Sequence, residues 1–228
     1  MANEGFSLNR LYSDSKKALF QPKDYFSTLP VEGGIGEPLI KALVYGVVAG
    51  IFVLLWSLFN VTGYTAGMFG GMIGIGGFFW SIIAAVIGVF IGGVVVLLIS
   101  AISGGSTEFE PSMRVAAAIM VLFPINAFLG FFDGISPVLG SLITLLVNLY
   151  GVYMLYLAVK GILKGKEETT RIVSYILAGL MVIFLIIGMA TRSAVERATF
   201  RNEDKVKEMI REQQKELEEI EEELEEED

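Results

Sequence analysis

The chain of 228 residues contains neither cysteine nor histidine. These absences exclude disulfides, thiolate nucleophiles, metal sites built from Cys or His, and Ser-His-Asp chemistry. Carboxylates could still pair, but no two of them fall together inside an apolar segment. We therefore expect a protein that is not an enzyme and that needs no metal or cofactor.

Charge is missing from the whole stretch 42–107, which is 66 residues long and contains no Asp, Glu, Lys or Arg. The chain as a whole is 54% hydrophobic and 18% charged, with a mean hydropathy of +0.63. A water-facing fold does not leave so long a stretch without charge. The sequence predicts an all-α integral membrane protein that crosses the bilayer several times.

Five segments are long and apolar enough to span about 30 Å of hydrocarbon. They are 39–59, 78–100, 115–132, 138–159 and 172–189. We expect a kink in the third, which contains Pro124. This gives three regions: an amphipathic cytoplasmic or interfacial segment at 1–37, a membrane domain at 38–191, and a tail at 192–228.

The net charge of −8 comes entirely from the tail, which holds 15 acidic and 7 basic residues. Its apolar residues recur in steps of three and four, as in a coiled-coil seam. The positions beside this seam are acidic, so a parallel pair of tails would repel. We predict a long helical tail that stands alone or binds a basic protein partner.

Basic residues set the expected orientation, because Lys and Arg favour the cytoplasmic side. Five spans place ten of them on one side: Arg10, Lys16, Lys17, Lys23, Lys41, Arg114, Lys160, Lys164, Lys166 and Arg171. The tail then leaves on the opposite side with five more. A sixth span at 63–77 gives the same tally, but its seven glycines would cost a helix about 0.8–1 kcal/mol each. We favour an interfacial or re-entrant segment there.

The N-terminal segment is predicted to be an amphipathic helix that lies on the membrane. Leu8, Leu11, Tyr12, Ser15 and Leu19 share one face at helical spacing. Basic side chains beside this face, Lys16 and Lys17 among them, are available to lipid headgroups. Lys41, near the start of the first span, is expected to extend to the interface.

A charged island interrupts the apolar sequence at "GGSTEFEPSMRV". The glycines end one span and the Pro and acids can start the next, so a capped turn is the simplest interpretation. Phe109 should enter the interface, and Arg114 can meet headgroups or Glu110. As a docking site for lipid or a partner, the sequence suggests Lys16, Lys17, Phe109, Arg114, Lys164 and Lys166.

Within the spans, Ala84, Gly88 and Gly92 are spaced by four, which favours close helix packing. The alternative is a groove for lipid or a small molecule lined by the same face. Polar candidates in or near the spans are Asn126, Asn148 and Asp133. We expect Asp133 to serve a turn. Asn148 suits an interhelical hydrogen bond or, alternatively, a role in permeation or ligand binding.

Four stretches resemble the Yip-domain family of multi-pass membrane proteins: "ALFQPKDYFSTL", "GGSTEFEPSMRVAAAIMVLFP", "GISPVLGSLI" and "LYLAVKGILKGKEETTRIV". The resemblance runs from Ala18 to about Leu180 and implies five spans and a cytoplasmic N-terminus. The Asp-Leu-Tyr-Gly-Pro motif of eukaryotic members, which interact with Rab-type GTPases, is absent. The chain is more similar to prokaryotic members, so GTPase binding is not carried over.

The combined prediction is a non-enzymatic protein of the cell membrane that organises lipid or partner interactions, in trafficking or curvature. The alternative is a transporter, channel or lipid-moving protein. The expected partners are the lipid bilayer and, through self-association, a second copy of the chain. Nothing in the sequence points to nucleic acid.

Overall fold

The computed structural model describes residues 7–59 and 70–191, with the backbone alone at 70–73. The described residues form helices and no strand. Five of these helical segments are long and apolar enough to cross a membrane: Gly36–Leu58, Gly74–Ile102, Phe109–Ile135, Pro137–Lys160 and Glu167–Thr191. The predicted all-α membrane fold with five spans is confirmed. The predicted tail lies outside the described residues.

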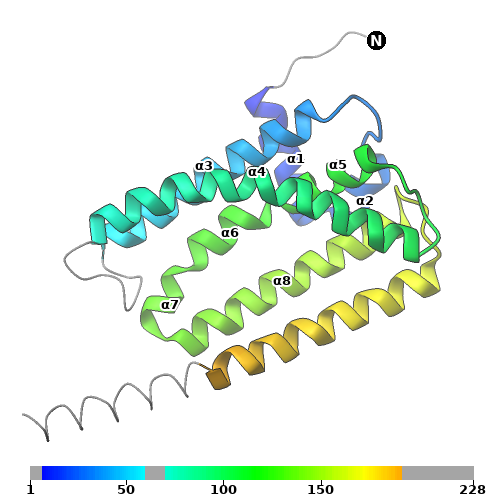
Figure 1. Ribbon diagram of the computed structural model, residues 1–228. Coiled ribbons are helices and arrows are strands. Elements are labelled where there is room, and N and C mark those ends of the chain that lie inside the picture. The colour runs from blue at the N-terminus through cyan, green and yellow to red at the C-terminus, as the bar shows by residue number, and fades with distance from the viewer. Residues whose placement is uncertain (1–6, 60–69, 192–228) are drawn as a thin grey trace, which may run out of the picture. The chain divides into compact units, whose positions relative to one another are not determined.

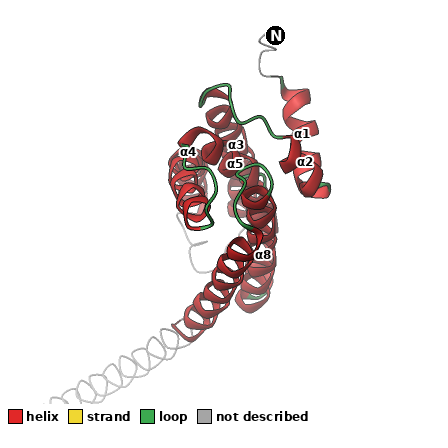
Figure 2. Ribbon diagram, turned by 90° about the vertical axis from the view of Figure 1, so that its right-hand side faces the viewer, coloured by secondary structure: helices red, strands yellow, loops and turns green. Residues whose placement is uncertain are grey.

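Two short helices precede the spans. Helix α1 (Leu8–Phe20) begins where the Ser7 hydroxyl accepts a hydrogen bond from the Arg10 amide, at 3.2 Å. Helix α2 (Pro22–Thr28) follows at once, with Pro22 at its first position. Both lie on one flank of the long helices and cross their direction rather than following it (Figures 1 and 2).

Helices α3 (Gly36–Leu58) and α4 (Gly70–Ile102) pack closely against each other. Glycines make this approach possible, since a Cβ at Gly46 would lie 2.8 Å from the Ala85 Cβ. Helix α4 begins at Gly70, so its first eight residues belong to the segment 63–77 that was expected to be interfacial or re-entrant. Residues 70–77 are helical because glycines such as Gly74 bring α4 against α3 and the contact outweighs their low helix propensity, while 63–69 lie outside the described residues.

The third span is built from α5 (Phe109–Ile119), α6 (Leu122–Leu129) and α7 (Phe131–Ile135). The break between α5 and α6 falls at Met120 and Val121, directly before the turn that contains Pro124. Proline has no amide hydrogen and its ring clashes with the carbonyl four residues back, so the helix fails there. Helix α8 (Pro137–Lys160) starts after Ser136, whose hydroxyl accepts from the Leu139 amide at 3.5 Å.

One end of the bundle holds two of the connections between spans, and we name it the basic end. It comprises the connections 103–108 and 161–166 together with the first residues of α3 and α5. Backbone hydrogen bonds join the two connections: the Ser106 amide donates to the Leu163 carbonyl and the Lys166 amide to the Ser103 carbonyl, both at 2.7 Å. Helices α1 and α2 attach beside this end, through contacts described next.

Candidate functional site

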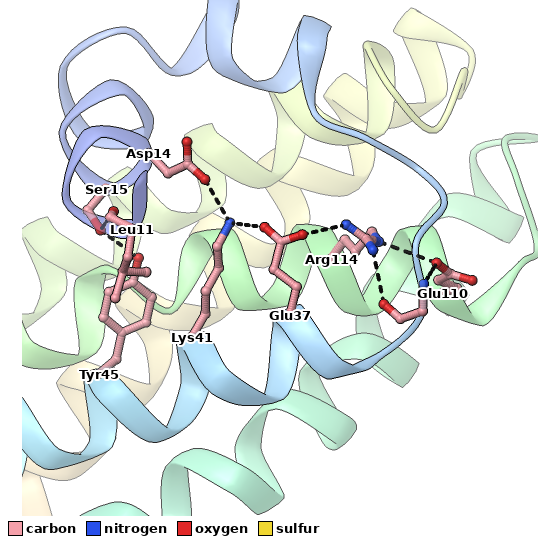
Figure 3. Close-up of polar contacts among 9 residues, drawn as sticks. Leu11, Asp14, Ser15, Glu37, Lys41, Tyr45, Glu110 and Arg114 are labelled. Atoms are coloured by element: carbon pink, nitrogen blue, oxygen red, sulfur yellow. Dashed lines mark hydrogen bonds and ion pairs between the residues drawn. The ribbon is translucent and has the colours of Figure 1, made fainter. Parts of the chain in front are cut away.

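Five charged side chains connect α1, α3 and α5 at the basic end (Figure 3). The Lys41 ammonium lies 3.1 Å from Asp14 and 2.9 Å from Glu37. The other oxygen of Glu37 meets Arg114 at 3.0 Å, and Arg114 also meets Glu110 at 3.4 Å. We name these five residues the charge cluster. Each base contacts two acids, so neither positive charge is buried without compensation.

Arg114 stands at the centre of this arrangement, and its side chain is buried. Besides the two carboxylates, it donates to the Gly34 carbonyl at 3.0 Å, while the Gly34 amide donates to Glu110. Gly33 has a φ of +129°, and a Cβ there would lie 2.6 Å from the guanidinium. Only glycine combines that backbone conformation with room for the arginine. The segment before α3 that contains Gly33 and Gly34 is thereby held against α5.

Helix α1 is held to the spans by polar and apolar contacts together. The Asp14–Lys41 ion pair is joined by a 2.8 Å hydrogen bond between the hydroxyls of Ser15 and Tyr45. Near the C-terminal end of α1, the Tyr150 hydroxyl donates a hydrogen bond to the Leu19 carbonyl. Leu11 and Ala18 of α1 are buried against the same flank. In α2, burial raises the pKa of Tyr25 to about 12 and keeps that phenol neutral. Helix α1 is therefore part of the folded body.

The outer side of α1 carries a stripe of exposed residues four apart. Leu8, Tyr12 and Phe20 are 67%, 72% and 77% exposed, and the exposed Lys16 completes the series. We name these four residues the α1 stripe. The sequence placed Leu8 and Tyr12 on one face with Leu11, Ser15 and Leu19. The structure divides that face, because Asp14, Ser15 and Ala18 turn toward the spans and rotate Leu8 and Tyr12 outward.

The level of α1 along the spans follows from its partners on α3. Lys41 and Tyr45 come five and nine residues after the start of α3 at Gly36. At 1.5 Å per residue, these positions lie about 8 and 14 Å along the helix. These contacts hold α1 beside the first three turns of α3.

The predicted docking residues fall in three environments. Lys16 and Lys17 are exposed on α1, and Lys164 and Lys166 are exposed in the connection 161–166. Phe109 is half-buried and packs against a small apolar cluster of α3, α4 and α5. Arg114 is the correction to the docking set: its guanidinium is occupied by Glu37, Glu110 and the Gly34 carbonyl, so it does not face lipid headgroups.

The predicted packing stripe of α4 is shifted by one residue. Its fully buried face is Ser81, Ala85, Val89 and Gly93, whereas Ala84, Gly88 and Gly92 are half-buried. Within the stripe, Gly92 does pack, since a Cβ there would lie 3.3 Å from the Ala116 Cβ. A Cβ at Gly88 would meet nothing within 4 Å. Both Gly88 and Gly92 also line an apolar cavity of about 330 Å³.

The three polar candidates in the spans separate into a pair and a lone residue. The Asn126 amide donates to the Asn148 side-chain oxygen at 3.4 Å, which joins α6 to α8. The Asn126 oxygen is buried without a hydrogen-bond partner. Asp133 lies in α7, at the end of the bundle away from the charge cluster, directly against Gly140 of α8. Its position is that of a residue supporting the α7–α8 turn.

Sequence reasoning did not find the charge cluster as a unit. Lys41 was expected to reach outward to the interface, but it is buried between Asp14 and Glu37. Part of the signal was present, because Glu37–Lys41 and Glu110–Arg114 have the i, i+4 spacing of helical ion pairs. The links between helices, which bring Asp14 and Arg114 to the same group, depend on the tertiary fold.

The comparison with protein families agrees with this architecture. The Yip1 domain matches residues 16–189, which is more than half of the chain and includes all of α2 to α8. No curated protein and no solved structure matches the sequence. With five apolar helices and this match, the chain belongs to the Yip1-domain family of multi-pass membrane proteins.

Proposed function

We propose that the protein is a non-enzymatic membrane organiser that inserts α1 as a wedge into one leaflet. The observation that carries this proposal is the α1 stripe: Leu8, Tyr12 and Phe20 are exposed beside Lys16 on a helix fixed to the spans. Apolar side chains of this size, interleaved with a basic one, suit the boundary between acyl chains and anionic headgroups. Lys17 adds a second positive charge on the same helix.

The proposal includes an orientation. The basic end faces the cytoplasm, where anionic lipids attract Lys and Arg, and α1 lies in the cytoplasmic leaflet. Five spans then bring the acidic tail out on the opposite side. A basic protein partner for that tail, and self-association of the chain, stay predictions of the sequence.

The mechanism follows from the way α1 is held. A free amphipathic helix can leave the bilayer, but α1 is tied to α3 and α8 by an ion pair and hydrogen bonds. Each copy of the protein would therefore carry a permanent insertion in one leaflet only. Area added to one leaflet favours bending toward the other, so copies would concentrate on membranes curved outward on the cytoplasmic side.

The test is curvature sorting of the full-length protein, reconstituted in vesicles of mixed diameter that contain anionic lipid. Protein density per membrane area should rise as the vesicle diameter falls. The double variant Tyr12→Ser/Phe20→Ser should lose this dependence, and Lys16→Glu/Lys17→Glu should weaken it. Lys23→Glu, on the exposed side of α2, is the charge control and should behave as the parent does. Equal sorting by the parent and the Tyr12/Phe20 variant would refute the wedge.

A second candidate, a lipid-moving or transport function, is favoured by one observation. The buried Asn126 oxygen lacks a hydrogen-bond partner, and the Asn148 to which Asn126 donates lines the apolar cavity. Polar groups at such positions are candidates for a permeation path. In proteoliposomes, a fluorescent-lipid scrambling assay should then show activity that Asn148→Leu abolishes. A rate equal to that of protein-free vesicles would exclude this candidate.

A further inference from the structure

The apolar cavity is a groove that follows α4 along about a third of its length. It is lined by α4 from Gly88 to Ile99, by α5 and α6, by α8 from Asn148 to Leu155, and by Leu177 and Met181 of the last span. Asn148 is the one polar side chain among these lining residues. Gly88 leaves its inner part open, because no protein atom lies where its Cβ would project.

The length of the groove equals the depth of one leaflet. From Gly88 to Ile99 the helix advances eleven residues, or about 16 Å at 1.5 Å per residue. A bilayer core of about 30 Å gives each leaflet about 15 Å of hydrocarbon. The inner end at Gly88 and Asn148 lies near the middle of α4 and α8, and Ile99 lies one turn before the connection 103–108. The groove thus runs from mid-membrane toward the basic end.

Water is a poor occupant for this space. A volume of about 330 Å³ would hold several water molecules, but each needs two to four polar partners. The lining supplies a single amide side chain, which already accepts a hydrogen bond from Asn126. Cavities lined by apolar side chains stay dry and bind apolar ligands. In a protein that spans a bilayer, the ligand at hand is an acyl chain.

The basic end supplies charge near the outer mouth. Lys164 and Lys166 are exposed there, and neither forms an ion pair with a described residue. The Lys166 side chain extends over Gly104, where a Cβ would lie 3.5 Å from its Cε. Arg171 is exposed as well. The acids nearby are Glu167, which pairs with Lys160 at 2.7 Å, and the exposed Glu108 and Glu168.

We propose that this groove binds one acyl chain of an anionic glycerophospholipid from the leaflet at the basic end, with its headgroup phosphate at Lys164 and Lys166. The length of the groove, its apolar lining and the unpaired lysines all fit that ligand. The site is separate from the α1 stripe, and it can exist whether or not α1 bends the membrane.

The experiment uses the full-length protein in nanodiscs with a phosphatidylglycerol that carries a photoactivatable diazirine on its acyl chain. Cross-links should concentrate on peptides that contain Gly88 to Ile99 and Asn148 to Leu155. Gly88→Phe, which fills the open part of the groove, should reduce them severalfold. Gly76→Phe is the matched control: it lies on the same helix, also faces open space, and is not part of the lining. If Gly88→Phe does not fold, Gly88→Leu replaces it beside Gly76→Leu.

The headgroup is tested by competition between phosphatidylglycerol and phosphatidylcholine. Each basic residue near a membrane surface contributes about 1 kcal/mol, or about fivefold, to anionic attraction, so Lys164→Glu/Lys166→Glu should reduce the preference for the anionic lipid about thirtyfold. Cross-links spread evenly over all apolar faces, or unchanged in the Gly88 variants, would overturn the groove site. Cross-links between two copies of the chain at these peptides would also overturn it. An unchanged lipid preference in the lysine variant would overturn the headgroup assignment.

Discussion

Helix α5 borders both the charge cluster and the apolar groove. The protein supplies every partner in the first and leaves space in the second. On one flank, Glu110 and Arg114 belong to the charge cluster, where each base meets two acids. On the other, Ala116 and Ile119 line a groove in which no protein atom fills the space beside Gly88. Buried charges must find partners within the protein, because acyl chains offer none. An apolar gap needs no such partner, because acyl chains can fill it.

The largest expected effect on stability comes from disrupting the charge cluster. Arg114→Ala removes the group that joins α3, α5 and the Gly34 carbonyl, and leaves Glu37 and Glu110 with less compensation. Loss of one partner from a buried ion pair costs about 3 kcal/mol or more. The melting temperature in detergent should fall strongly, and Arg114→Lys should recover only part, since an ammonium cannot imitate the guanidinium fork. An Arg114→Ala protein as stable as the parent would mean that the cluster does not hold the fold.

The second effect contrasts a packed glycine, Gly46, with an open one, Gly88. Gly46→Leu places a side chain where a Cβ already lies 2.8 Å from the Ala85 Cβ and 3.0 Å from the Ile82 Cα. Overpacking of this kind costs about 1–3 kcal/mol. A Cβ at Gly88 has no described atom within 4 Å, so Gly88→Leu can enter the groove and should change the melting temperature little or raise it. Comparing both variants in the same detergent is the check, and equal losses would show that the space beside Gly88 is not open.

The sequence predicts the spans well because uncharged apolar length is a local property. The uncharged stretch 42–107 contains most of α3 and all of α4, and α8 begins at Pro137. The buried face of a helix is harder to predict. The face predicted for α4 was shifted by one residue, because Ala84 and Ala85 look alike in sequence. The charge cluster needed tertiary information: the i, i+4 pairs were visible, but the meeting of Asp14 with Lys41 depends on how α1 crosses α3.

The smallest of these effects tests how firmly α1 is attached. Asp14→Asn keeps the shape of the side chain but removes its charge, so Lys41 retains Glu37 alone as an ionic partner. A hydrogen bond between charged groups contributes about 1.5–3 kcal/mol, and Ser15, Leu11 and Ala18 still hold the helix, so a loss of about 1 kcal/mol is expected. Amide exchange should accelerate across Leu8–Phe20 while the interior of α3 keeps its protection. Asp24→Asn, an exposed acid on α2 with no ion pair to a described residue, is the control. If α1 exchanges at the parent's rate in Asp14→Asn, the ion pair is not part of its attachment, and the apolar contacts and remaining hydrogen bonds hold α1.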